Sequence, residues 1–157
     1  MDRYRKQSEV SRCTGNYNLE GGMIWSDEYK IGLPAIDSQH KRLFQLIREL
    51  NEALDSGLRL VNVERLLAGL DQYKTRHFQL EEKYMQESNY PGLAEQQKSH
   101  AFFTNRFETL GKELSKTGIT PDIIQTIKGE LTDWLKTHVT GLDLEFGKYY
   151  QKQKRLS

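Results

Sequence analysis

The sequence predicts an all-α fold: an up-down-up-down antiparallel four-helix bundle with an extended N-terminal arm. Two observations lead to this prediction. Apolar residues recur at helical spacing in four long stretches, and no stretch shows the sustained alternation of a β-strand. The connections between the stretches are short and contain glycine, proline and asparagine, which favours antiparallel packing of neighbouring helices.

The chain of 157 residues suits one domain with a polar segment at each end. Residues 1–22 are rich in Arg, Lys, Ser, Asn and Gly without a visible period, so we expect a disordered lead. The bundle is expected over residues 23–150, followed by a basic C-terminal tail over residues 151–157. The segment before the first helix contains Gly32 and Pro34, which indicate an extended arm.

Cap and breaker residues define the expected helix boundaries. Asp37, Asn62 and Thr120 carry side-chain oxygens directly before helical stretches and are the expected N-caps. Gly57 and Gly118 follow such stretches, as glycines do at helix ends. The expected helices are therefore residues 38–55, 63–87, 93–114 and 121–146.

Charge and cysteine content narrow the function classes. Lys and Arg number 23 against 22 Asp and Glu, a formal net charge of +1, which gives no electrostatic basis for binding nucleic acid or an anionic membrane. No apolar run is long enough to span a membrane, and the N-terminus lacks the apolar core of a signal peptide. The single cysteine, Cys13, cannot form an internal disulfide, so we expect a reducing compartment, the cytoplasm.

All four histidines of the chain interrupt the apolar stripes, with one on each expected helix. They are His40, His77, His100 and His138. A single buried histidine is usually a hydrogen-bonded core residue, because an unpaired buried polar group costs about 1–3 kcal/mol. Four of them, accompanied by inward carboxylates, are better explained by one shared metal site. In antiparallel helices their positions fall at the same end of the bundle.

Two carboxylates have spacings that suit such a site. Glu81 lies four residues after His77, so the two side chains are neighbours on one helix face. Asp143 lies five residues after His138, slightly off that face, and needs a loosened helix end or a one-residue bulge to point inward. Imidazole and carboxylate ligands without a thiolate suit iron, manganese or zinc.

Taken together, the motifs resemble the haemerythrin family, specifically its bacterial single-domain members, over roughly residues 24–150. Each motif alone is weak, but their order and separations are specific. The matching stretches are IWSDEY at 24–29, IDSQHK at 36–41, HFQLEE at 77–82, YP at 90–91 followed by His100, and WLKTH at 134–138 followed by Asp143.

This resemblance implies a non-haem diiron centre, an oxo- or hydroxo-bridged pair of Fe ions that Glu81 and Asp143 also bridge. One iron is then held by His40 and His77 and keeps an open position for O2. The implied function is O2 storage, delivery or sensing. Because the chain has no room for an output domain, a sensor would need a separate signalling partner, and reduction of the irons would need a redox partner.

The chain departs from the family pattern at Gln96. The family's second iron normally has three histidines, two of them four apart on the third helix. Here His100 and His138 are present, but Gln96 stands four residues before His100. Three outcomes are open: Gln96 coordinates through its amide oxygen, a water that Gln96 hydrogen-bonds takes the place, or the second iron binds poorly.

Two alternative functions remain beside an oxygen-binding protein without catalytic residues. A diiron oxidase or peroxidase is favoured by Gln96, because a further exchangeable position would allow redox turnover. A degenerate bundle, with a mononuclear site or no metal, would act as an interaction module. Metal content separates the last reading from the others, and consumption of peroxide with a reductant separates the enzyme from the carrier.

Overall fold

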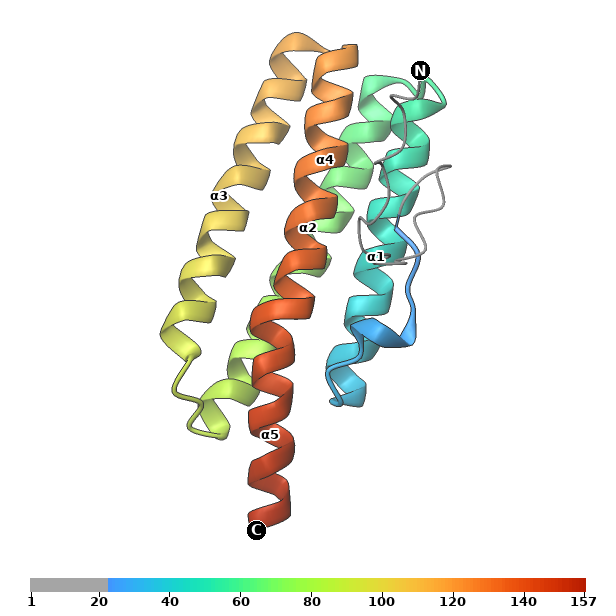
Figure 1. Ribbon diagram of the computed structural model, residues 1–157. Helices are drawn as coiled ribbons and strands as arrows, with labels where there is room; N and C mark the ends of the chain where they lie inside the picture. The colour runs from blue at the N-terminus through green and yellow to red at the C-terminus, as the bar shows by residue number, and fades with distance from the viewer. Residues whose placement is uncertain (1–22) are drawn as a thin grey trace, which may run out of the picture.

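The structure, a computed structural model, describes residues 23–157 (Figure 1). The expected disordered lead, residues 1–22, lies outside the described residues, and so does Cys13. Within the described part the chain forms helices and no strand. The elements are η1 Asp27–Tyr29, α1 Pro34–Asp55, α2 Leu60–Glu87, α3 Leu93–Thr117, α4 Pro121–His138, the π-helical turn η2 Val139–Asp143, and α5 Leu144–Leu156.

The four long helices form the predicted antiparallel bundle. Helix α1 packs against α2 and α4, and α3 packs against the same two helices, so the chain runs around the bundle in sequence order. Helix α5 continues the direction of α4 through η2 and projects past the end of the bundle (Figure 1). The all-α four-helix fold is thus confirmed.

The bundle has two apolar clusters, separated along the helices by the layer that contains the histidines. The larger cluster holds the predicted stripes, for example Leu50, Leu70 and Leu131. The smaller one lies on the other side of the histidine layer, where the arm meets α5. Its buried members are Ile31, Leu33, Ile36, Met85 and Phe146. The polar layer is therefore closed by hydrocarbon on both sides.

The start of the first helix differs from the prediction. Helix α1 begins at Pro34, because proline at the first helical position loses no hydrogen bond and already has a helical φ. Asp37 is consequently inside the helix and is not its N-cap; its side chain instead binds the backbone of the arm. Its carboxylate accepts hydrogen bonds from the backbone N–H groups of Ile31 and Gly32, at 2.7 and 3.2 Å.

The other boundaries follow the expected caps except at two points. Helix α2 begins at Leu60, so Asn62 is not its N-cap. Gly118 ends α3 with a φ of +73°, and the hydroxyl of Thr120 accepts a hydrogen bond from the Ile123 N–H at 3.2 Å, as predicted. The second point is the end of the last helix, which was expected at residue 146. Helix α5 continues to Leu156 and so includes most of the expected C-terminal tail.

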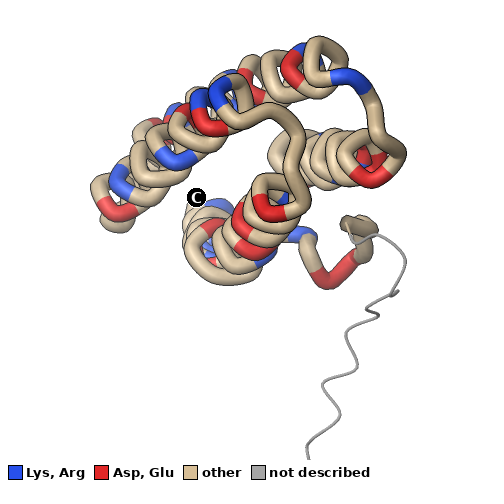
Figure 2. The backbone as a smooth tube through the Cα atoms, turned by 90° about the horizontal axis from the view of Figure 1, so that it is seen from above, with Lys and Arg blue, Asp and Glu red and all other residues tan. Residues whose placement is uncertain are grey.

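The outer surface mixes both signs of charge. Figure 2 shows Lys and Arg interspersed with Asp and Glu over the helices, in keeping with the near-zero net charge. Among the described helices, none has the length and hydropathy needed to cross a lipid bilayer.

Candidate metal centre

The imidazole rings of all four histidines converge in the interior of the bundle. The Nε2 atoms of His40 and His77 lie 3.1 Å apart, and those of His100 and His138 are also 3.1 Å apart. None of the four residues is more than 4% exposed. One pair comes from α1 and α2 and the other from α3 and α4, so each half of the bundle contributes one pair of imidazoles.

Two fully buried carboxylates lie between these pairs. Glu81 Oε1 is 3.5 Å from His40 Nε2, and Glu81 Oε2 is 3.1 Å from His100 Nε2. Asp143 Oδ2 is 3.2 Å from His40 Nε2, and Asp143 Oδ1 is 3.0 Å from His138 Nε2. Each carboxylate therefore reaches both imidazole pairs, as a bridging ligand must.

The donor atoms form two overlapping groups of four, each with its atoms within 4.8 Å of one another. Each group contains two imidazole nitrogens and an oxygen from each of the two carboxylates. The first group is His40, His77, Glu81 and Asp143, and the second is Glu81, His100, His138 and Asp143. This arrangement offers two adjacent positions with equivalent ligand types.

The unpaired oxygens of the two carboxylates indicate whether the site suits a pair of metal ions. Both oxygens of Glu81 and Oδ2 of Asp143 are buried without an aligned hydrogen-bond donor. A buried carboxylate without compensation is costly, and cations between the two imidazole pairs would provide that compensation. Nitrogen and oxygen donors with no thiolate match iron, manganese and zinc. The residues present thus fit a dinuclear centre.

The turn η2 explains how Asp143 reaches the site. Its five residues, Val139–Asp143, wind with π-helical spacing between α4 and α5. The wider spacing compensates for the five-residue separation from His138, which an uninterrupted α-helix would place off the shared face. The bulge considered from the sequence is therefore present in the structure.

The outward-facing nitrogens of three rings have polar partners. His77 Nδ1 lies 2.9 Å from Gln39 Oε1, and His100 Nδ1 lies 2.7 Å from Glu82 Oε1. Since those oxygens accept, Nδ1 carries the proton in both rings and Nε2 offers its lone pair to the centre. His138 Nδ1 lies 3.1 Å from the hydroxyl of Ser99.

The two histidines of the first pair have opposite pKa shifts. Burial opposes the positive charge of His40, but interactions with Asp143 and Glu81 outweigh it and raise the pKa of His40 to about 10. Burial dominates at His77 and lowers its pKa to about 4. Without a metal, His40 therefore carries a proton beside the carboxylates at neutral pH, while His77 is neutral.

The carboxylates are held in their charged form despite complete burial. Desolvation raises the pKa of Asp143, but the neighbouring His138 and His40 outweigh it and leave that pKa well below its usual value. The pKa of Glu81 is lowered in the same way by the histidines around it, against burial and the charge of Asp143. Charged carboxylates are the form that a cation needs.

Aromatic rings stack on the second pair of imidazoles. Phe78 lies parallel to His100, with ring centroids 3.8 Å apart, and Trp134 lies parallel to His138 at 4.4 Å. Trp134 also stacks on Phe103 at 3.9 Å. These rings shield the outer faces of the imidazoles from water.

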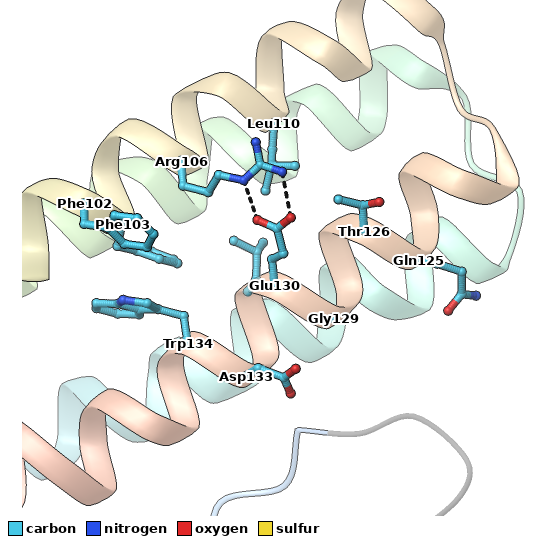
Figure 3. A pocket seen from close by; sticks show the side chains of 11 residues that line it. Phe102, Phe103, Arg106, Leu110, Gln125, Thr126, Gly129, Glu130, Asp133 and Trp134 are labelled. Atoms are coloured by element: carbon cyan, nitrogen blue, oxygen red, sulfur yellow. Dashed lines mark hydrogen bonds and ion pairs between the residues drawn. The ribbon is translucent and has the colours of Figure 1, made fainter.

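Trp134 also lines a surface pocket of about 490 Å³ between α3 and α4 (Figure 3). The guanidinium of Arg106 and the carboxylate of Glu130 pair across this pocket at 2.5 and 2.6 Å. The exposed ring of Phe102 lies at its rim. Trp134 connects this pocket with the metal centre, because its ring also stacks on His138.

Gln96 lies beside Asp143 in the interior and is 1% exposed. Its amide Nε2 donates a hydrogen bond to Asp143 Oδ1 at 3.0 Å, and its carbonyl Oε1 has no hydrogen-bond partner. Because Asp143 Oδ1 also contacts His138, the Gln96 side chain lies at the half of the site formed by His100 and His138. This is the half at which it is expected from the sequence.

All seven residues singled out from the sequence come together at one point: His40, His77, Glu81, Gln96, His100, His138 and Asp143. The outer partners Gln39 and Ser99 were missed. Each stands directly before a histidine in the sequence, yet each contacts the histidine of the next helix. Only the packing of neighbouring helices, not spacing along one helix, could have identified them.

Comparisons with known proteins agree with this geometry. Residues 32–149 match the family model described as "Hemerythrin HHE cation binding domain". The bacteriohemerythrin of Stenotrophomonas maltophilia is 29% identical over 121 residues, which cover 77% of this chain and 76% of that protein. The myohemerythrin of Riftia pachyptila is 22% identical over 131 residues, covering 83% of this chain and 96% of that protein.

A solved structure of wild-type hemerythrin superposes with a TM-score of 0.70 at 24% identity, covering 82% of this chain and 97% of that one. At this identity the superposition supports the fold. The family match extends over most of the chain and includes every residue of the converging cluster. The chain therefore belongs to the haemerythrin family and is related to its bacterial members.

Proposed function

We propose that the protein is a non-haem diiron protein that binds O2. The observation that carries the proposal is the pair of overlapping donor groups, with two imidazoles each and both carboxylates in common. Four-helix bundles house dinuclear centres with inward ligands from all four helices in this manner. When bound, two ferrous ions supply the electrons that reversible O2 binding requires.

His40 and His77 are the proposed terminal ligands of one iron, and His100 and His138 those of the other. Glu81 and Asp143 are the proposed bridging ligands, since each carboxylate reaches both imidazole pairs. The outer hydrogen bonds of His77, His100 and His138 with Gln39, Glu82 and Ser99 orient these three rings. In this ligand set Gln96 stands in place of a histidine.

The apolar surroundings have a defined role in this proposal. The layer of ligands lies between the two apolar clusters, and Phe78 and Trp134 cover two of the imidazoles. Hydrocarbon on both sides excludes water and protons from the site, so a bound gas molecule can leave unchanged. Retention of O2 as O2 thus depends on packing as much as on the ligands.

The test is iron quantification together with absorption spectra of the reduced and the air-exposed protein. We expect two irons per chain and a reversible spectral change on adding and removing O2. The His77→Leu variant is expected to lose this change, while Gln45→Leu, a substitution on the exposed face of α1, should keep it. A wild-type chain with fewer than two irons would count against the proposal.

A diiron peroxidase or oxidase is the second candidate, and Gln96 favours it because the second iron would have one imidazole fewer. Catalytic consumption of hydrogen peroxide with an added reductant, at a rate well above O2 release, would identify the enzyme. Stable O2 binding without turnover would identify the carrier. A purified chain without bound metal would instead favour the third candidate, a degenerate bundle that acts as an interaction module.

O2 storage, delivery and sensing all use the same site, and they differ in the partner. For storage or delivery the chain needs only a reductant, a redox partner protein that keeps the irons ferrous. For sensing, the proposed partner is a signalling protein. The single Cys13 supports a reducing compartment, the cytoplasm, as the proposed setting.

A further inference from the structure

The amide of Gln96 is only half satisfied in the interior of the bundle. Its Nε2 donates to Asp143 Oδ1 at 3.0 Å, while its Oε1 is buried and has no partner. A buried carbonyl without a donor costs free energy, and proteins rarely leave such a group unpaired. The unpaired oxygen therefore needs an explanation.

The orientation of this amide follows from chemistry. Asp143 is fully buried and is a proposed bridging ligand, and a carboxylate in the ionised form that binds metal only accepts hydrogen bonds. If the amide were turned over, Oε1 would face a carboxylate oxygen and both groups would lose a partner. Nε2 must therefore point to Asp143 Oδ1, which itself lies 3.0 Å from His138 Nε2, and Oε1 is left without a donor beside that half of the site.

The protein ligands of that half leave coordination positions of a bound ion unfilled. The group of Glu81, His100, His138 and Asp143 supplies two nitrogens and two carboxylate oxygens. Non-haem iron held by two histidines and carboxylate keeps open positions for external ligands. Among the described residues with buried unpaired atoms, Gln96 is the one that adds a neutral acceptor beside this half.

We propose that the His100–His138 half has a second position for an external ligand, next to Gln96. The position takes a small oxygen ligand that carries a hydrogen-bond donor: water, hydroxide or hydrogen peroxide. The inference rests on the proposed diiron function and specifies what one half of that centre binds.

The class of ligand follows from the Gln96 carbonyl. A ligand with an O–H group donates to Oε1 and removes the unpaired acceptor, whereas a ligand without hydrogen meets a lone pair. Dioxygen has no hydrogen to donate, so it is not favoured at this position. It would bind at the His40–His77 half instead. The two halves of the centre would then differ in the ligands they prefer.

The Asp143 hydrogen bond gives Gln96 a further part. By holding Oδ1, Nε2 fixes the carboxylate that bridges the two halves, while Oε1 faces the external ligand. Gln96 is thus a positioning residue for Asp143 and the acceptor for that ligand. Methionine has a similar length, no donor for Asp143 and only a weak acceptor in its sulfur, so Gln96→Met is the informative substitution.

The first test is a titration of the iron(III)-loaded protein with azide, an anion that has no hydrogen-bond donor, followed by absorption. We expect one azide to bind at the His40–His77 half and a second, weaker one beside Gln96. Gln96→Met should tighten the second event by about tenfold, or ~1.4 kcal/mol. Gln96→His should abolish it, because the imidazole fills the position.

The matched controls are Gln125→Met and Gln125→His, the same changes at an exposed position of α4, which should titrate like wild type. Iron content and circular dichroism of every variant show whether it folds and loads. An unchanged or weaker second azide event in a fully loaded Gln96→Met protein would overturn the inference.

The second test is a crystal structure of the iron-loaded wild-type protein. A solvent molecule on the ion held by His100 and His138, within hydrogen-bond distance of Gln96 Oε1, supports the inference. A direct bond from Oε1 to that ion overturns it and leaves the proposed diiron function intact. Fewer than two irons overturns both.

Discussion

The indole ring of Trp134 lies parallel to the imidazole of His138, with ring centroids 4.4 Å apart and an angle of 14° between the planes. Trp134 also lines the surface pocket between α3 and α4 (Figure 3). Its ring therefore contacts both that pocket and a proposed iron ligand. The rate at which solvent reaches His138 should therefore depend on this ring.

Replacing Trp134 with leucine should expose His138 to the pocket. We expect iron release to a chelator at least several-fold faster than in wild type, and a loss of about 2 kcal/mol in the free energy of unfolding of the metal-free protein, since a half-buried indole is truncated. Trp134→Phe keeps a ring over His138 and should show a smaller effect on both. Equal release rates for the leucine and phenylalanine variants would contradict the shielding role.

Metal uptake should release protons through His40. The pKa of His40 is raised to about 10 in the metal-free protein, so the ring is protonated at neutral pH, yet a bound metal needs its neutral form. Zinc binding at pH 7, measured by calorimetry in two buffers of different ionisation enthalpy, should release about one proton from this residue. His77, whose pKa is lowered to about 4, should release none.

The sign of the pH dependence follows from the same shift. Because the folded-state pKa of His40 is above the ordinary histidine value of 6.5, its contribution to the stability of the metal-free protein is complete below pH 6.5 and is lost as the pH rises towards 10. Metal affinity changes in the opposite direction and should increase over that range. An affinity that is constant between pH 6.5 and 9 would contradict the assignment.

Glu82 should contribute to metal affinity without touching the metal. Its carboxylate lies 2.7 Å from His100 Nδ1 and fixes the ring orientation. We expect Glu82→Gln to weaken metal binding by about 10- to 100-fold, the usual effect of losing such an outer partner. Competition with a chromogenic chelator measures it. Glu87→Gln, an exposed change at the end of α2, is the control and should leave the affinity unchanged.

Gly147 should tolerate no side chain. A Cβ at this position would meet the carbonyl oxygen of Ile31, which belongs to the arm and cannot move without displacing it. We expect Gly147→Ala to cost about 1–3 kcal/mol in the free energy of unfolding. Gly129→Ala, in α4 with nothing near the added methyl group, should instead stabilise by roughly 1 kcal/mol, as measured by denaturant unfolding. A loss at both positions would show that the close approach to Ile31 is not the cause.

The helices and the converging histidines can be predicted from the sequence because both depend on periodicity along one chain segment. A period of 3.6 residues shows which face of a helix is buried, and the interruptions at His40 and His100 lie on that face. The start of α1 is a different case. Pro34 suits both an extended arm and a first helical turn, and packing against the core decides between them.

Contacts between helices are beyond such reasoning. Gln39 and Ser99 each contact a histidine of a neighbouring helix, and nothing in the spacing of one helix shows which residue lies opposite. For Gln96 the sequence indicates the position but not the direction of its amide. That direction depends on the charge of Asp143, which is known only once the two side chains are placed together.

The π-helical turn between α4 and α5 has an effect that reaches beyond Asp143. One additional residue in a helix rotates everything after it by about 100° relative to an uninterrupted helix. The same insertion that swings Asp143 into the ligand layer therefore also turns Phe146 and Gly147 toward the arm at Ile31. The five residues of η2 thus place both Asp143 and the residues that contact the N-terminal arm, so we expect loading of the ions to slow proteolysis of the arm.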